Sequence, residues 1–165
     1  MDLRAEFQSI MQEYGRPILL LHKDETKRCP CWNDTYGTAS KECPICLGLG
    51  YVFTLERHMA RTVIQSIPET LPRINRSLAP AEISITSRIF FTTHDVIAKE
   101  KDLIIDTSWS GDKAIIDPYT GVYEVGYVEP ERGDNGRIEY IKIFTKIDPV
   151  EHSFRLQDVV RRYNS

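Results

Sequence analysis

Four cysteines constrain this chain more than any other feature, because all of them fall between positions 29 and 46 of a 165-residue sequence. They form two close pairs, Cys29-Pro30-Cys31 and Cys43-Pro44-Ile45-Cys46, with eleven residues between them. Short turns can present two such pairs so that four thiolates surround one metal ion at about 2.3 Å each. The spacing predicts a zinc knuckle whose ligands are Cys29, Cys31, Cys43 and Cys46.

Two strained disulfides or four free thiols are the alternatives to a metal site. The N-terminal residues Met1 to Glu6 are charged where a signal peptide would be apolar, so we expect a reducing cytoplasm, in which clustered cysteines favour metal. Gly48 and Gly50 follow the second pair, where a chain that turns back past a thiolate needs permissive backbone dihedrals. Four cysteines would leave no open coordination position, which indicates a structural ion.

Composition narrows the class of protein further. The chain carries 21 basic and 24 acidic residues, a net charge of -3, and so offers no general attraction to nucleic-acid phosphates. No run approaches the roughly 18 to 20 apolar residues of a membrane span, so no membrane association is expected. The length suits one hydrophobic core with small additions.

Apolar periodicity predicts one N-terminal helix and a set of strands. Leu3, Phe7, Ile10 and Met11 form one stripe on a helix from Leu3 to Tyr14, which Gly15-Arg16-Pro17 ends. The predicted strands are 18–22, 52–63, 82–91, 102–106, 121–130 and 136–147, with a hairpin connection at 131–135.

These elements predict a mainly β fold, a small antiparallel β-barrel of SH3-like or OB-like type with an N-terminal helix and the zinc knuckle. Three prolines and polar residues mark 66–80 as a long projecting loop. The expected division is 1–50 for helix, strand and knuckle, 51–149 for the barrel, and 150–165 for a C-terminal arm that either forms a short helix or binds a partner.

We find no sequence pattern for catalysis, and the prediction is a protein that is not an enzyme and takes no small-molecule substrate. The histidines, at positions 22, 58, 94 and 152, lack metal-ligand spacing, and the H-x-E of the zinc deaminases is absent. Thr93-His94-Asp95 is interpreted as a turn, because adjacent strand residues point to opposite faces. Trp32 is expected to pack over the metal site.

The order of features resembles a known family, the short neck or head-closure (stopper) proteins of tailed bacteriophages, over roughly Cys29 to Asp148. A Cys-Pro-x-Cys-x-Gly-x-Gly knuckle near the N-terminus is one part of the likeness. The other is a pattern of strand, charged turn, D-x-I, strand and Y-E-V, carried by Ile89-Phe90-Phe91, 97–105 and 121–130.

The resemblance implies a virion protein of the phage neck, assembled in the cytoplasm of the bacterial host. Such proteins form a homo-oligomeric ring, with six copies as our first expectation and twelve as the second. The ring would contact the portal or adaptor and the tail-terminator protein, help to close the channel, and let genomic DNA pass through. Adaptor or tail terminator are the alternatives to stopper within this family.

A module that binds nucleic acid through a zinc ribbon and an OB-like barrel is the alternative from another class. Its compact basic group would be Arg155 with Arg161-Arg162, because the other basic residues are scattered among acidic ones. A zinc enzyme is disfavoured, because four cysteines would fill the coordination sphere.

Overall fold

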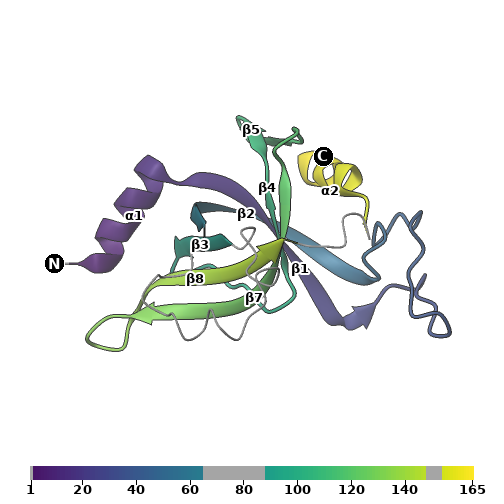
Figure 1. Cartoon of the computed structure of the whole chain (residues 1–165), viewed down its shortest axis with the longest axis horizontal. Coiled ribbons are helices and arrows are strands. Elements are labelled where there is room, and N and C mark those ends of the chain that lie inside the picture. The colour runs from purple at the N-terminus through teal and green to yellow at the C-terminus, as the bar shows by residue number, and fades with distance from the viewer. Residues whose placement is uncertain (1, 65–87, 148–153) are drawn as a thin grey trace, which may run out of the picture. The chain divides into compact units, whose positions relative to one another are not determined.

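The computed structural model describes residues 2–64, 88–147 and 154–165 (Figure 1). Within these ranges the chain forms two helices and eight strands. In chain order they are α1 (Leu3–Tyr14), β1 (Arg16–Arg28), β2 (Tyr51–Ile64), β3 (Arg88–Thr93), β4 (Leu103–Asp106), β5 (Ser108–Ser110), β6 (Lys113–Ile115), β7 (Gly121–Arg132), β8 (Ile138–Ile147) and α2 (Leu156–Asn164).

Hydrogen-bonded ladders connect six of the strands in the order β1-β2-β3-β8-β7-β4, and a β1–β4 ladder joins the last strand of that order to the first. The ladders β1–β4, β2–β3, β3–β8 and β4–β7 are antiparallel. Strands β5 and β6 form a separate two-stranded sheet. The predicted mainly β fold with an N-terminal helix is confirmed at this level.

Contacts divide the chain into two compact units, and strands β2 and β7 each contribute residues to both of them. Unit 1 comprises Met1–Arg16, Met59–Glu100 and Val125–Ile147; unit 2 comprises Pro17–His58, Lys101–Glu124 and Asp148–Ser165. These units interleave along the sequence, and the division into 1–50, 51–149 and 150–165 stays a prediction.

In unit 1, helix α1 lies against strands β3 and β8. Phe7 stacks on Tyr140 of β8 with ring centroids 4.6 Å apart, and Met11 is fully buried. In the β3–β8 ladder Phe90 lies opposite Ile143, and both side chains are inaccessible to solvent. The predicted helix bounds are confirmed, and Phe7 and Met11 of the predicted apolar stripe are the residues that pack against the strands.

In unit 2, strand β4 lies between β1 and β7, with all four of its residues buried. The core of the unit joins these strands to the cysteine segment and to helix α2. Its buried members are Leu19, Leu21, Leu47, Leu49, Phe53, Leu103, Ile105, Ala114, Phe154, Val159 and Val160. The C-terminal segment forms the short helix that was one of its two expected forms, and binding to a partner stays a prediction.

Several predicted strands differ from the observed ones at their ends. Strand β1 continues from the apolar run 18–22 to Arg28, because antiparallel pairing can extend through residues whose side chains are exposed. The three-residue strands β5 and β6 were not predicted, since so short a segment shows no period. The expected loop 66–80 and the first part of the expected strand 82–91 lie outside the described residues.

Among the described helices, none has the length and apolar character needed to cross a membrane.

Candidate metal centre

The cysteine segment is a loop between strands β1 and β2, closed at its base by the backbone. Cys29 follows the last residue of β1, and its N–H donates to the carbonyl of Gly50, just before β2, at 2.9 Å. The two pairs of cysteines therefore begin and end one loop between two strands that are neighbours in the sheet.

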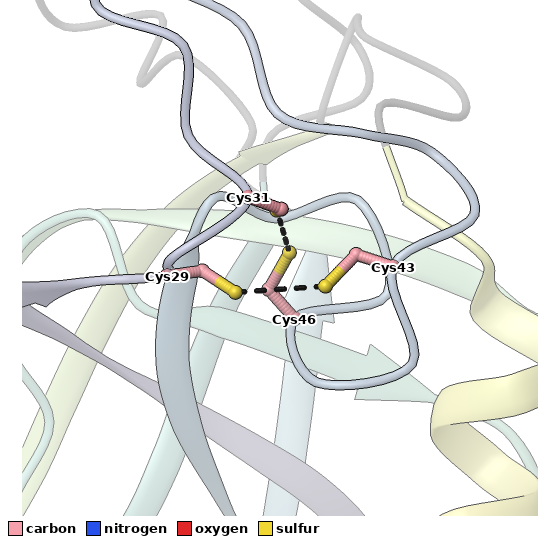
Figure 2. A group of neighbouring side chains, drawn as sticks. All are labelled: Cys29, Cys31, Cys43 and Cys46. Carbon is pink, nitrogen blue, oxygen red and sulfur yellow. Dashed lines mark hydrogen bonds between the residues drawn. The ribbon is translucent and has the colours of Figure 1, made fainter.

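The four thiols point toward one another (Figure 2). The Cys29 and Cys43 sulfurs lie 3.6 Å apart, those of Cys31 and Cys46 lie 3.4 Å apart, and all four fall within 4.8 Å of one another. In a tetrahedron with metal–sulfur bonds of about 2.3 Å, neighbouring sulfurs are about 3.8 Å apart. The predicted residues are thus brought together with nearly the spacing that a tetrahedral metal ion requires.

The same distances bear on the disulfide alternative. A disulfide bond is about 2.05 Å long, and all four cysteines are free thiols. Each short contact joins a cysteine of the first pair to one of the second, so a single ion would tie the two ends of the loop together. Among the described residues, the group of His, Cys, Asp or Glu side chains close enough together to hold a metal ion consists of these four cysteines.

Tight turns place the second pair. The N–H of Leu47 donates to the Cys43 carbonyl and that of Leu49 to the Cys46 carbonyl, both at 3.0 Å. Gly48 and Gly50 have φ of 94° and 82°, a region open to glycine. The expectation that these glycines let the chain turn back past a thiolate is confirmed.

The thiols differ in how easily they ionise. Burial raises the pKa of Cys29, and it raises the pKa of Cys31 to about 12. The backbone N–H groups of Cys46 and Ile45 point at the Cys43 sulfur and lower its pKa to about 6. Cys29 and Cys31 would therefore release their protons on becoming metal ligands, as thiols do when they bind a metal.

Trp32 packs within the loop. A Cβ on Gly50 would come within 2.8 Å of the indole ring, so the ring lies directly on the Gly50 backbone. The Arg28 guanidinium sits 4.2 Å from the centre of the indole and 5.6 Å from that of Tyr51. Cys31 and Ala39 are the partly buried hydrophobic residues that pack against the three buried cysteines, and Trp32 is not among them. The expectation that Trp32 packs over the metal site is therefore wrong, and the indole supports the loop beside that site.

The structure also brings together two histidines that sequence reasoning treated separately. His22 Nδ1 lies 2.7 Å from Oδ2 of the buried Asp102, and His22 Nε2 lies 3.2 Å from Glu56 Oε2. His58 Nε2 contacts the same Glu56 oxygen at 2.8 Å. The sequence could have indicated the contact between Glu56 and His58, because residues two apart on one strand lie on the same face.

None of the described histidines belongs to the cysteine cluster. His94 lies in the predicted turn after β3, where the N–H of Val96 donates to the Thr93 carbonyl at 3.2 Å. His152 lies outside the described residues.

Comparison of the chain with protein-family models and with curated proteins finds no match. The function must therefore be inferred from the cysteine cluster, from the fold, and from the resemblance in the sequence pattern.

Proposed function

We propose that the cysteine cluster binds one structural zinc ion. Four buried or half-buried thiols at near-tetrahedral spacing match the all-cysteine sites that zinc prefers, and they fill its coordination sphere. The loop between the pairs is largely exposed and has few apolar residues to bury, so an ion would supply the stability that packing does not. The proposed role of the metal is structural and not catalytic.

Elemental analysis of the freshly purified chain tests this step. About one zinc per chain is expected, because the four thiols form a single site. Replacement of zinc by Co²⁺ should give the absorption bands of tetrahedral thiolate coordination. Protein with no stoichiometric metal, or a Co²⁺ spectrum typical of six-coordinate oxygen ligands, would contradict the proposal.

The fold we propose is a small antiparallel barrel of SH3-like or OB-like type. The order of ladders from β1 through β3 and β8 to β4, and back to β1, supports it. The D-x-I and Y-E-V parts of the sequence pattern fall on β4 and β7, which pair directly, with Ile104 opposite Tyr123. These two parts of the pattern are thus neighbours in the sheet, whereas Ile89-Phe90-Phe91 lies on β3, which pairs with β2 and β8.

For the whole chain we propose a non-enzymatic role as a neck protein of a tailed bacteriophage, a ring that joins the portal side of the head to the tail. The observation that carries this proposal is the combination of a cysteine knuckle with the paired β4–β7 pattern. Exposed apolar side chains in both units, such as Tyr119 at 92% and Ile97 at 71% exposure, offer contacts to neighbouring subunits. Six copies is the first choice and twelve the second, because head-to-tail contacts around an axis close into a ring.

Location and copy number in the particle test the neck role. Cryo-electron microscopy of the phage that encodes the chain should find it between head and tail, in several copies around the particle axis. A single copy per particle, or a position on the capsid surface away from the neck, would contradict it. If the chain lies in the neck, the proteins that contact its ring would distinguish a stopper from an adaptor or a tail terminator.

One observation favours the alternative of a nucleic-acid-binding module. Arg28, Trp32 and Tyr51 form a cation and aromatic cluster on the cysteine loop, a combination that can stack on bases. The net charge of -3 and the pairing of Arg155 and Arg161 with Asp158 weigh against it. An affinity for single-stranded DNA that falls steeply with salt would favour this alternative over the neck protein.

A further inference from the structure

Helix α2 bonds to the turn that holds the second cysteine pair. The Arg162 guanidinium donates to the carbonyl of Ile45 at 2.9 Å and also to that of Pro44. Arg155 donates through its guanidinium to the Cys43 carbonyl at 3.3 Å and through its backbone N–H to the Leu47 carbonyl at 2.9 Å. Four carbonyls of one short turn thus accept hydrogen bonds from two arginines of the C-terminal segment.

Apolar packing and the far end of α2 hold the helix in this position. Phe154, Val159 and Val160 belong to the same buried cluster as Leu47 and Leu49, which flank the cysteine turn. Asn164 exchanges two hydrogen bonds of 2.9 Å with the backbone of Ala114 in β6. The arginines therefore approach the turn from a helix that is fixed at both ends.

The peptide groups that Arg162 contacts are the ones that face a cysteine sulfur. The Pro44 carbonyl shares a peptide group with the Ile45 N–H, and the Ile45 carbonyl shares one with the Cys46 N–H. Both N–H groups point at the Cys43 sulfur. Because N–H and C=O of a trans peptide point in opposite directions, Arg162 can hold both N–H groups aimed at that sulfur.

Charge strengthens this arrangement. Four thiolates around a divalent ion leave an excess of negative charge, which hydrogen bonds to the sulfurs and nearby cations relieve. Arg162 places a positive charge at the oxygen end of two peptide groups whose N–H ends meet a thiolate. Hydrogen bonds that involve charged groups are stronger than neutral ones, and linked ones reinforce each other.

We propose that Arg162, supported by Arg155, is a positioning residue for the metal centre, and that docking of helix α2 and binding of the metal are coupled. Metal binding orders the turn whose carbonyls receive the helix, and the docked helix aims the peptide N–H groups at Cys43. Coupling between two binding events is reciprocal, so each must strengthen the other by the same factor. This inference rests on the proposed metal centre and is independent of the neck role.

The chain supplies a matched control. Arg161 lies next to Arg162 on the same helix, with its side chain 77% exposed, and pairs with Asp158 at 2.9 Å. Arg161→Ala removes the same charge from the same helix and leaves the contacts to the cysteine turn in place. Arg162→Lys keeps the charge but replaces the planar fork that reaches two carbonyls at once.

Zinc affinity of the full-length chain, measured by competition with a chromophoric chelator, is the first readout. Arg162→Ala is expected to weaken zinc binding by about 10- to 100-fold, the range seen when outer hydrogen-bond partners of metal ligands are removed. Arg161→Ala should change it less than about threefold, and Arg162→Lys should fall between the two. Circular dichroism checks that each variant keeps its β structure, and if Arg162→Ala does not fold, Arg162→Lys provides the same comparison.

Hydrogen exchange of α2 is the second readout, and it does not depend on affinity. Removal of zinc from the wild-type chain should sharply reduce the protection of α2 amides and leave α1 amides protected. Zinc affinity within about twofold of wild type in Arg162→Ala, or unchanged α2 protection without zinc, would overturn the coupling while the metal centre stands. A wild-type chain that binds no zinc would overturn both.

Discussion

The helices at the two ends of the chain dock on different kinds of surface. In unit 1, α1 rests on strands that are already paired, through the Phe7–Tyr140 stack and the buried Met11. In unit 2, α2 rests partly on a turn that lies outside the sheet and carries two of the four cysteines. Both helices combine apolar packing with arginine hydrogen bonds, since Arg4 of α1 donates to the Ile138 carbonyl of β8. The difference is that the first docking surface is paired sheet, whereas the second is complete only where the cysteine loop is ordered.

Loss of a metal ligand should give the largest difference between the two units, because it should unfold part of unit 2 and leave unit 1 folded. Cys43→Ala is expected to reduce the zinc content from about one per chain to near zero and to unfold the region from His22 to Tyr51 together with α2 docking. Helix α1 and strands β3 and β8 should keep their structure, because their core comes from residues such as Phe90 and Ile143. Elemental analysis and hydrogen exchange measure the two effects.

Lys41→Ala, an exposed change within the same loop, is the control and should leave zinc content and exchange unchanged. If Cys43→Ala removes protection from α1 and α2 alike, the chain unfolds as one cooperative unit and the distinction between the two docking surfaces is wrong.

A cavity in the core of unit 1 should have the opposite effect, because it should lower the stability of the fold without reducing the zinc content. Phe90→Ala is expected to lower the free energy of unfolding by about 3–5 kcal/mol, because the side chain is fully buried against the β8 ladder. Zinc content should stay at the wild-type level. Val63→Ala on β2, at a half-exposed position, should cost less than about 0.5 kcal/mol. Urea unfolding of zinc-loaded protein measures these costs, and zinc loss in Phe90→Ala would contradict the separation.

Two glycines of the cysteine loop test how closely its backbone is packed. Gly50 and Gly37 both have positive φ, but a Cβ on Gly50 would come within 2.8 Å of Trp32, whereas one on Gly37 meets nothing. Gly37→Ala is expected to cost about 1 kcal/mol from the backbone alone. Gly50→Ala adds the displacement of the indole and should cost about 1–3 kcal/mol more. Thermal unfolding of the zinc-loaded variants measures the difference, and equal costs would show that Trp32 moves aside freely.

The parts that sequence could predict are those with a strong local signal. The stripe of Leu3, Phe7, Ile10 and Met11 predicted α1 at its observed bounds, and two close cysteine pairs predicted which side chains would meet. Both signals are contained in short stretches, so no knowledge of distant contacts was needed.

The parts that sequence missed depend on partners far along the chain. Helix α2 was left open because its adjacent Val159 and Val160 acquire meaning only against the cysteine turn, more than a hundred residues earlier. The hydrogen bond from the Trp109 indole to the Pro17 carbonyl, which anchors β5, spans a similar separation. The contact of His22 with Asp102 could not be found either, because it follows from the pairing of β1 with β4.

The His22 cluster provides the smallest expected effect and a test of unit 2 that is independent of metal. Both ring nitrogens of His22 face carboxylate oxygens, so both can donate only when the imidazole is protonated. The hydrogen bond to Asp102 is the main reason that the pKa of His22 is raised, with Glu56 adding to it. A raised pKa in the folded state stabilises the fold fully below the unfolded value of about 6.5, and that stability is lost as pH rises through the folded value.

The contribution of His22 to the free energy of unfolding is expected to be less than about 1 kcal/mol, as for partly exposed ion pairs. The free energy of unfolding of zinc-loaded protein at pH 5.5 and 8.5 should therefore differ more in wild type than in His22→Gln. His58→Gln, which removes the second partner of Glu56 but keeps the bond to Asp102, should retain most of the difference. If His22→Gln shows the same pH dependence as wild type, the protonated His22 bridge contributes nothing to the stability of unit 2.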